Sequence, residues 1–325
     1  MLLTLSAAVS LHAQSALAPA PTRDSKVVRR WSLPGDPHGI TLGPDGTLYV
    51  GLAQPQAVVA IDPARGTIKR KAILDSAEIA ATKELVALRM NTAGTRLFVA
   101  NGSDESATIL TLPALGVVRE ITIEGEPIRD ALPDPKGRYL FLLGHRVHVY
   151  DANGTAELRA LGFDEPTAMA INAGGSTVAV FGNNRLALYD AKTLEEIAGD
   201  RLETGKRVEA AFFAAGDRVL IALTSDALYE IPLGKGTVNN ERICLPDGSG
   251  PQIAALAAPQ LVLFAEQRCT GGGAFSSGGR IVAPASLYGV NAYAIAYDAR
   301  GNFLYTTERA GYLTIYRVPR AAVAH

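Results

Sequence analysis

The chain has 325 residues, 48% hydrophobic and 19% charged, and its 32 glycines and 18 prolines suit many short strands joined by tight turns. A formal net charge of -1, without a long block of like charge, gives no basis for nucleic-acid binding or attraction to an anionic membrane. After the N-terminus, no apolar run reaches the roughly 18 residues that span a bilayer. We expect a folded protein without a membrane span.

The first segment of the chain is predicted to be a secretory signal peptide, over residues 1–21. An apolar stretch from Leu2 to Leu11 is followed by small residues and proline, with cleavage expected between Ala13 and Ala20. A positively charged start is missing, so a disordered apolar tail is the alternative. A signal peptide would place residues 22–325, as one domain, in the periplasm or outside the cell.

Seven segments along the remaining chain share a polar turn followed by a short β-branched or aromatic run. The turn markers lie 38 to 48 residues apart, at Gly46, Gly94, Gly137, Gly175, Gly216, Pro259 and Gly301. This period is typical of a propeller blade, which is a four-stranded antiparallel sheet. In the sixth copy, Pro259 and Gln260 stand where the others have the turn glycine.

The two ends of the chain predict how the ring closes. The last repeat stops after its third strand, YLTIYRV, while residues 26–34, KVVRRWSLP, precede the first repeat. We predict an all-β, seven-bladed propeller in which this N-terminal strand completes the last blade, with Trp31 packed there. Such closure leaves no exposed sheet edge at the junction, so a monomer is expected.

Several of these strings resemble a known repeat family. PDGTLYV, FVAN (Phe98 to Asn101) and VVAIDPARGTI are similar to YVTN-type (YncE-like) repeats of exported bacterial propellers. The resemblance covers most of residues 36–318, with departures at Gly51 and Leu52 and in the degenerate sixth repeat. It implies a fold and export, but no particular activity.

Candidate site residues follow from the expected start of each innermost strand at one channel mouth. The positions eight residues before the turn markers are His38, Val86, Arg129, Thr167, Val208, Pro251 and Tyr293. With the neighbours of these positions, the predicted ligand site comprises His38, Arg129, Asp130, Glu209 and Tyr293. A wet mouth with no ligand is the alternative. Arg89 is placed along the channel, where it would neutralise a carboxylate.

Other features are assigned structural roles or left open. The Gly/Ser-rich residues 270–279 are expected to form a mobile loop at the mouth, with Phe275 the one residue of it near a ligand. Cys244 and Cys269 form either a disulfide or two buried thiols.

No metal or cofactor is predicted. His145 and His148 are three residues apart and so lie on opposite faces of a strand. The aspartates Asp62, Asp151 and Asp190 recur near the ends of third strands, which indicates turn hydrogen bonds.

Three functions remain for this scaffold. We favour a non-catalytic binding or interaction protein whose unknown partner, a small molecule or a protein, lies at the channel mouth or on the blade rims. The alternative is a lactonase-like hydrolase or a lyase at the same mouth, with His38 or Glu209 as base and Arg129 stabilising negative charge. Of the strand expected from streptogramin-type lyases, only Tyr305 to Glu308 comes close. The third is a structural part of a larger exported assembly.

Overall fold

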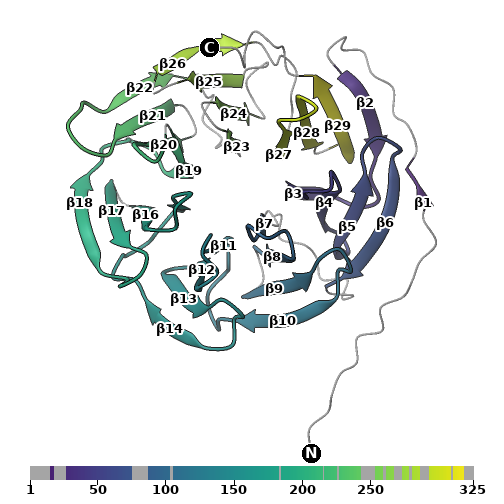
Figure 1. Cartoon of the computed structure of the whole chain (residues 1–325), viewed down its shortest axis with the longest axis horizontal. Coiled ribbons are helices and arrows are strands. Elements are labelled where there is room, and N and C mark those ends of the chain that lie inside the picture. The colour runs from purple at the N-terminus through teal and green to yellow at the C-terminus, as the bar shows by residue number, and fades with distance from the viewer. Residues whose placement is uncertain are drawn as a thin grey trace, which may run out of the picture.

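The computed structural model describes residues 15–17, 27–74, 87–102, 105–182, 184–214, 216–224, 227–242, 253–258, 261–266, 273–277, 280–285, 293–308 and 310–317. Their regular structure is entirely β, and the four- and five-stranded sheets stand in a ring with one strand of each innermost (Figure 1). Within these residues, no helix is long and apolar enough to cross a bilayer.

Six blade sheets are formed, each from strands that follow one another in the chain apart from β1 and β2. The first contains β3 (Pro37–Leu42), β4 (Leu48–Ala53), β5 (Gln56–Asp62), β6 (Thr67–Ile73) and the short β1 (Ser15–Ala16). The second contains β7 (Ala87–Met90), β8 (Arg96–Ala100), β9 (Ser106–Thr111) and β10 (Val117–Thr122). The third contains β11 (Asp130–Pro133), β12 (Tyr139–Leu143), β13 (Val147–Asp151) and β14 (Glu157–Ala160).

The remaining blades follow the same order from the channel outwards. The fourth contains β15 (Ala168–Ile171), β16 (Thr177–Gly182), β17 (Arg185–Asp190) and β18 (Glu196–Arg201). The fifth contains β19 (Val208–Ala214), β20 (Val219–Thr224), β21 (Ala227–Pro232) and β22 (Asn239–Arg242). The closing blade contains β27 (Ala294–Asp298), β28 (Phe303–Glu308), β29 (Tyr312–Arg317) and β2 (Val27–Ser32).

The prediction of seven four-stranded blades is wrong, because the described residues form six. Between the fifth and the closing blade, β23 (Ile253–Ala258) pairs with β24 (Leu261–Glu266), and β25 (Gly273–Ser277) pairs with β26 (Arg280–Ala285). These are two separate two-stranded sheets. The sequence supplies the reason: glycine weakens strands, and Pro284 in β26 has no N–H to donate to a ladder.

The N-terminal strand closes the ring as predicted, because β2 pairs antiparallel with β29 from Val27–Tyr316 to Ser32–Tyr312. Side chains reinforce this pairing. Arg30 donates to the buried Glu308 carboxylate and, at 3.2 Å, to the Thr314 hydroxyl. The Trp31 indole N–H donates to the Pro63 carbonyl at 3.1 Å, so this ring packs at the closing strand as expected.

The turn chemistry expected from the sequence is present. The turn glycines Gly46, Gly94, Gly137, Gly175 and Gly216 have φ values from +59° to +83°, and in the last unit Asn302 takes this left-handed conformation. Asp190 accepts the N–H groups of Lys192 and Thr193, both at 2.8 Å. These bonds lower the pKa of the Asp190 carboxyl.

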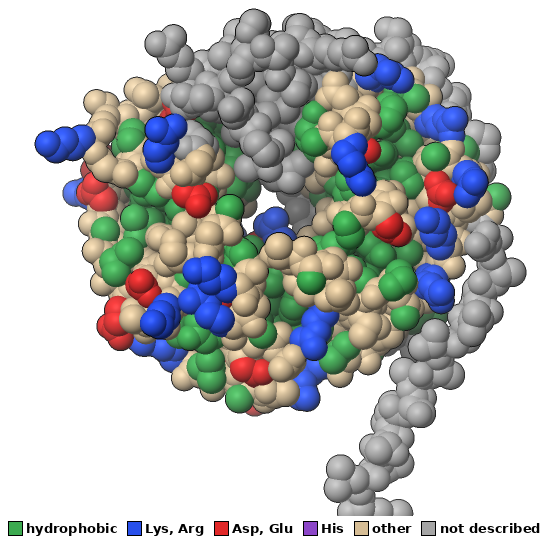
Figure 2. Space-filling model, in the orientation of Figure 1, with side chains coloured by type: hydrophobic (Ala, Val, Ile, Leu, Met, Phe, Trp, Pro, Cys, Tyr) green, Lys and Arg blue, Asp and Glu red, His purple; other side chains and the backbone are tan. Residues whose placement is uncertain are grey.

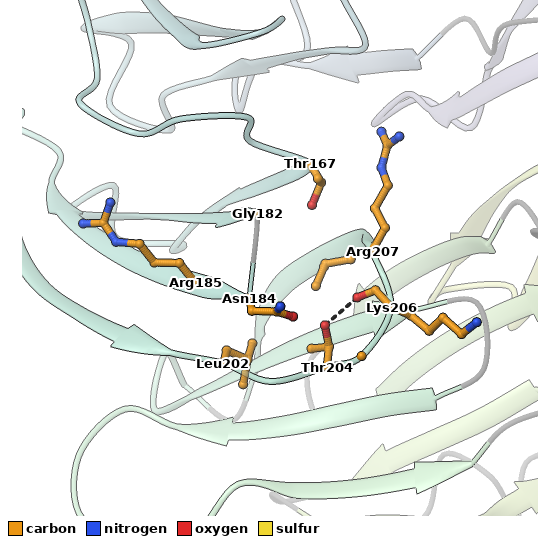
Figure 3. A pocket seen from close by; sticks show the side chains of 10 residues that line it. Thr167, Gly182, Asn184, Arg185, Leu202, Thr204, Lys206 and Arg207 are labelled. Carbon is orange, nitrogen blue, oxygen red and sulfur yellow. Dashed lines mark hydrogen bonds between the residues drawn. The ribbon is translucent and has the colours of Figure 1, made fainter.

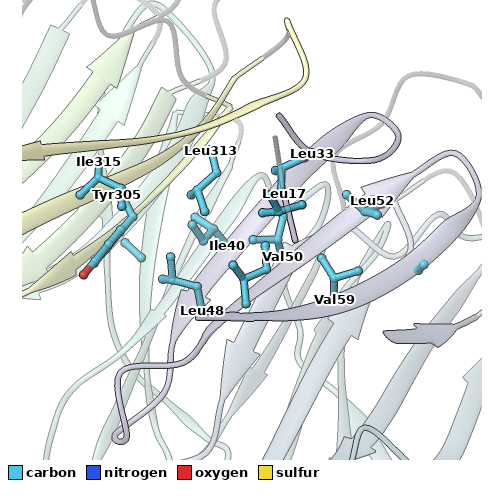
Figure 4. Close-up of a cluster of buried hydrophobic side chains, with 13 residues drawn as sticks. Leu17, Leu33, Ile40, Leu48, Val50, Leu52, Val59, Tyr305, Leu313 and Ile315 are labelled. Atoms are coloured by element: carbon cyan, nitrogen blue, oxygen red, sulfur yellow. The ribbon is translucent and has the colours of Figure 1, made fainter. Parts of the chain in front are cut away.

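The apolar core lies between neighbouring blades. Figure 4 shows the seam between the closing and first blades, where Leu48, Val50, Leu313 and Ile315 meet. Leu17, which follows β1, is only 8% exposed and belongs to the same cluster. The blades are therefore held by burial on both faces, as the propeller architecture requires.

Candidate functional site

The first residues of the innermost strands lie together at one end of the channel. His38 is the second residue of β3, Val208 is the first of β19, and Arg129, Thr167 and Tyr293 each stand directly before an inner strand. Val86 and Pro251 fall outside the described residues. The mouth positions that the structure describes therefore follow the predicted register.

His38 and Tyr293 form one side of this ring, where the first and closing blades meet. Their rings stack with centroids 4.5 Å apart, and the His38 side chain is fully buried. A ring nitrogen of His38 lies 3.2 Å from the carboxylate of Asp36. Both rings are enclosed in the channel wall, so neither offers its face to a ligand at the mouth.

Arg129 and Asp130 are bound to other parts of the protein. The Arg129 guanidinium donates to the carbonyls of Gly144 (2.5 Å) and Pro166 (2.7 Å), and so ties the third blade to the fourth. Asp130 accepts two hydrogen bonds from Arg89, at 2.9 and 3.1 Å. Arg89 thus neutralises a carboxylate, as hypothesised from the sequence. Figure 2 shows a basic side chain in the central opening of the face in view.

A cavity of about 330 Å³ lies beside this mouth, between the fourth and fifth blades. We call it the interblade pocket; it is lined by Thr167, Gly182, Asn184, Arg185, Leu202, Thr204, Gly205, Lys206, Arg207 and Val208 (Figure 3). Two of these, Thr167 and Val208, are predicted mouth positions. The others come from the β16–β17 turn and from the loop that leads into β19.

Backbone conformation and hydrogen bonds shape the pocket. Asn184 and Gly205 are both left-handed, with φ of +57° and +64°, and so turn the chain sharply on either side of the cavity. Leu202 donates its N–H to the Asn184 carbonyl at 2.8 Å, which joins the two segments. The Tyr229 hydroxyl donates to the Thr204 carbonyl at 2.8 Å and fixes the loop against β21.

The rim of the pocket carries three cations. Arg185 contacts both carboxylate oxygens of Glu196, at 2.6 and 2.7 Å. Arg207 lies 3.9 Å from Glu209, and both side chains are partly exposed. The Lys206 ammonium is exposed and has no carboxylate within ion-pair distance in the described chain.

Glu209 is the predicted site residue that directly follows the pocket-lining Val208 in β19. Burial raises the pKa of its carboxyl, although Arg207 and Arg129 act in the opposite direction. A carboxyl with a raised pKa is a candidate for binding or proton transfer. The role of the predicted set as a ligand site stays a prediction.

We expect the replacement Glu209→Gln to flatten the pH dependence of stability. A raised folded-state pKa means that the folded chain holds this proton more tightly, so Glu209 favours folding at low pH. This advantage is lost as pH rises from the ordinary value of 4.5 through the raised one. The variant should therefore gain thermal stability relative to the wild type between about pH 4 and pH 7.

Unfolding midpoints measured across this range test the expectation. Glu124→Gln, at an exposed position on the loop after β10, controls for the loss of one negative charge. A stability difference between wild type and Glu209→Gln that stays constant with pH would contradict the assignment.

Metal-ligand geometry is not found in the described parts of the chain, where no three His, Cys, Asp or Glu residues are grouped to hold an ion. His148 instead bridges two carboxylates, Glu157 at 2.8 Å and Glu126 at 3.0 Å. Cys244 and Cys269 lie outside the described residues. Of the predicted loop 270–279, residues 273–277 form strand β25.

Sequence reasoning missed most of the residues that line the pocket. Asn184, Thr204 and Lys206 lie outside the eight-residue register that selected the mouth positions. A usable signal was the segment LETGKR from Leu202 to Arg207, where a glycine and two adjacent cations directly precede an inner strand. The cavity itself depends on how two blades meet, which no local pattern records.

Comparison with known proteins gives the fold alone. No protein-family model matches the chain, and no curated protein matches it. It is similar to a chain of a mitotic checkpoint complex, with a TM-score of 0.72, 16% identity and coverage of 98% of this chain and 99% of that one. A likeness to Kuenenia stuttgartiensis hydrazine synthase has a TM-score of 0.69 and 14% identity, over 88% and 96% of the two chains.

A third solved structure is the β-propeller domain of Myceliophteria thermophila Cps50 (Swd1). Its TM-score is 0.68 at 16% identity, and the match covers 88% of this chain and 98% of that one. With the blade sheets and the closing strand described above, these likenesses define the chain as a β-propeller protein. They do not assign it an activity, because propellers carry many unrelated functions.

Proposed function

We propose that this propeller is an exported binding scaffold that holds a small ligand at its channel mouth, in the interblade pocket. The observation that carries the proposal is a cavity of about 330 Å³ at the predicted mouth, lined by both polar and apolar groups. Small-molecule sites commonly have volumes of roughly 300–1,000 Å³ and a few converging polar groups. Export is supported by the apolar stretch from Leu2 to Leu11, which ends before β1, and by the YVTN-type resemblance of the repeats.

An enzyme at the same mouth is the second candidate function, and the position and raised pKa of Glu209 favour it. Its carboxyl follows Val208, which lines the pocket, and its pKa is raised by burial. The other proposed base, His38, is enclosed in the channel wall under Tyr293. A hydrolase or lyase would therefore use Glu209 as its base, with Arg207 nearby to stabilise negative charge.

A pair of tryptophan variants tests the ligand site. Thr167→Trp places a large ring in the pocket, whereas Thr193→Trp adds the same ring at an exposed turn between β17 and β18. Consecutive turns of an antiparallel sheet alternate between its ends, so this control lies on the opposite face. We expect compounds that raise the unfolding temperature of the wild type to act equally on Thr193→Trp and to lose their effect on Thr167→Trp.

The screen uses the purified chain with organic acids, sugars, lactones and phosphate esters, and each bound compound is then incubated and analysed for products. Both variants are first compared with the wild type by circular dichroism, so that a loss of folding is recognised. Equal responses of the two variants would overturn the proposed site. Turnover of a bound compound, lost in Glu209→Gln, would select the enzyme.

A further inference from the structure

The hydroxyl groups in the interblade pocket have a defined polarity. Thr167 Oγ1 donates to the Phe181 carbonyl at 3.3 Å, and Thr204 Oγ1 donates to the Lys206 carbonyl at 2.5 Å. A hydroxyl has one hydrogen and two lone pairs, so both oxygens retain only acceptor capacity. Figure 3 shows the Thr167 hydroxyl directed towards the space between the labelled side chains. A ligand that meets these oxygens must supply hydrogen-bond donors.

The rim of the same pocket carries donors and positive charge, so it requires a ligand group that accepts hydrogen bonds and is negatively charged. Lys206 and Arg207 are exposed neighbours on the loop before β19, and Arg185 adds a third cation, although Glu196 balances its charge. Within the described residues, no acceptor is bonded to the backbone N–H of Gly205 or Lys206. Successive N–H groups beside cations form a concave surface that suits an anion.

We infer that the interblade pocket takes a small organic anion with hydroxyl groups close to its charged group, an inference that rests on the proposed ligand site. The charged group lies against Lys206 and Arg207, and the hydroxyls donate to Thr167 and Thr204. The Asn184 amide, which both donates and accepts, also lines the pocket and lies beside Thr204 in Figure 3. Carboxylates and phosphates share the chemistry that the rim requires.

Calorimetric titration with five probes separates charge from hydroxyl groups. Succinate and tartrate differ only in hydroxyls, inorganic phosphate and glycerol 3-phosphate differ by a hydroxylated carbon chain, and threitol has hydroxyls without charge. At equal ionic strength, we expect tartrate or glycerol 3-phosphate to bind at least about tenfold more tightly than its unhydroxylated partner and than threitol, a factor that corresponds to about 1.4 kcal/mol. Whichever of the two binds more tightly identifies the charged group.

Two variants and their controls connect the binding to named atoms. Lys206→Ala/Arg207→Ala should weaken binding of the hydroxylated anion about tenfold. The control Lys192→Ala/Lys235→Ala removes two exposed charges from turns at the opposite end of the blades and should leave this affinity unchanged. Thr167→Val keeps the side-chain shape but removes an acceptor, and should reduce the affinity for tartrate towards that for succinate. Thr193→Val is its control.

The outcomes separate this inference from the function on which it rests. If threitol binds as tightly as tartrate and the Lys206 and Arg207 replacements have no effect, the requirement for a negatively charged group is overturned, although a ligand site remains. Equal affinities within each anion pair would overturn the hydroxyl requirement. Absence of binding by all five probes overturns the inference about the ligand. The proposed function is overturned only if, in the wider screen, compounds raise the unfolding temperature of Thr167→Trp as much as that of Thr193→Trp.

Discussion

Replacing Arg30 with methionine is expected to lower the free energy of unfolding by about 3 kcal/mol, at the lower end of the range for breaking a buried ion pair. Arg30 is the cation bonded to Glu308, whose side chain is only 4% exposed. Methionine keeps much of the aliphatic volume but leaves this carboxylate with the Tyr316 hydroxyl, at 3.4 Å, as a neutral partner. The loss arises from a buried charge without its cation, at the strand that closes the ring.

Urea denaturation of three variants tests this origin. Arg317→Met removes an arginine from the same strand pair, but one that is exposed and lies over the Phe303 ring, so its effect should stay below about 1 kcal/mol. Adding Glu308→Gln to Arg30→Met should recover part of the loss, because a neutral amide costs less to bury than a carboxylate. Equal losses for Arg30→Met and Arg317→Met would contradict the role of the pair.

Replacing Gly66 with alanine is expected to cost about 3 kcal/mol, in two parts. The φ of +64° costs an L-residue roughly 1–2 kcal/mol. In addition, a Cβ at Gly66 would stand 2.6 Å from Cδ2 and 2.7 Å from Cε2 of the Trp31 ring. Relief of this overlap requires the closing strand to shift, and overpacking of this kind typically costs about 1–3 kcal/mol.

Gly46 provides a matched comparison because its φ is +83° and a Cβ at this position would have no atom within 4 Å, so Gly46→Ala bears the conformational cost alone. Combining Gly66→Ala with Trp31→Leu should give a total loss smaller than the sum of the two separate losses, since the clash is then absent. Unfolding free energies of the wild type, the two single variants and the double variant complete the cycle, and Gly46→Ala is measured beside them. Equal losses at Gly66 and Gly46 would show that Trp31 does not press on this turn.

The candidate site could be predicted in position but not in composition. The repeat period placed Thr167 and Val208 at the starts of inner strands, where the structure has them, because strand register propagates along each blade. It could not show that His38 and Tyr293 stack inside the wall, or that Arg129 binds carbonyls across two blades. These contacts join residues from different repeats, and the sequence does not give the distance between blades.

The sequence by itself determined the β-propeller class, the turn residues and the closing strand, because each depends on local patterns: alternation within strands, left-handed turns, and a last blade one strand short. Only the tertiary structure decided the number of blades and the pocket. The sixth repeat has the length of a blade, but a blade exists only where all four strands pair, and in the described part of this repeat β23 pairs only with β24 and β25 only with β26. Likewise, the interblade pocket exists because the β16–β17 turn and the loop before β19 meet across two blades.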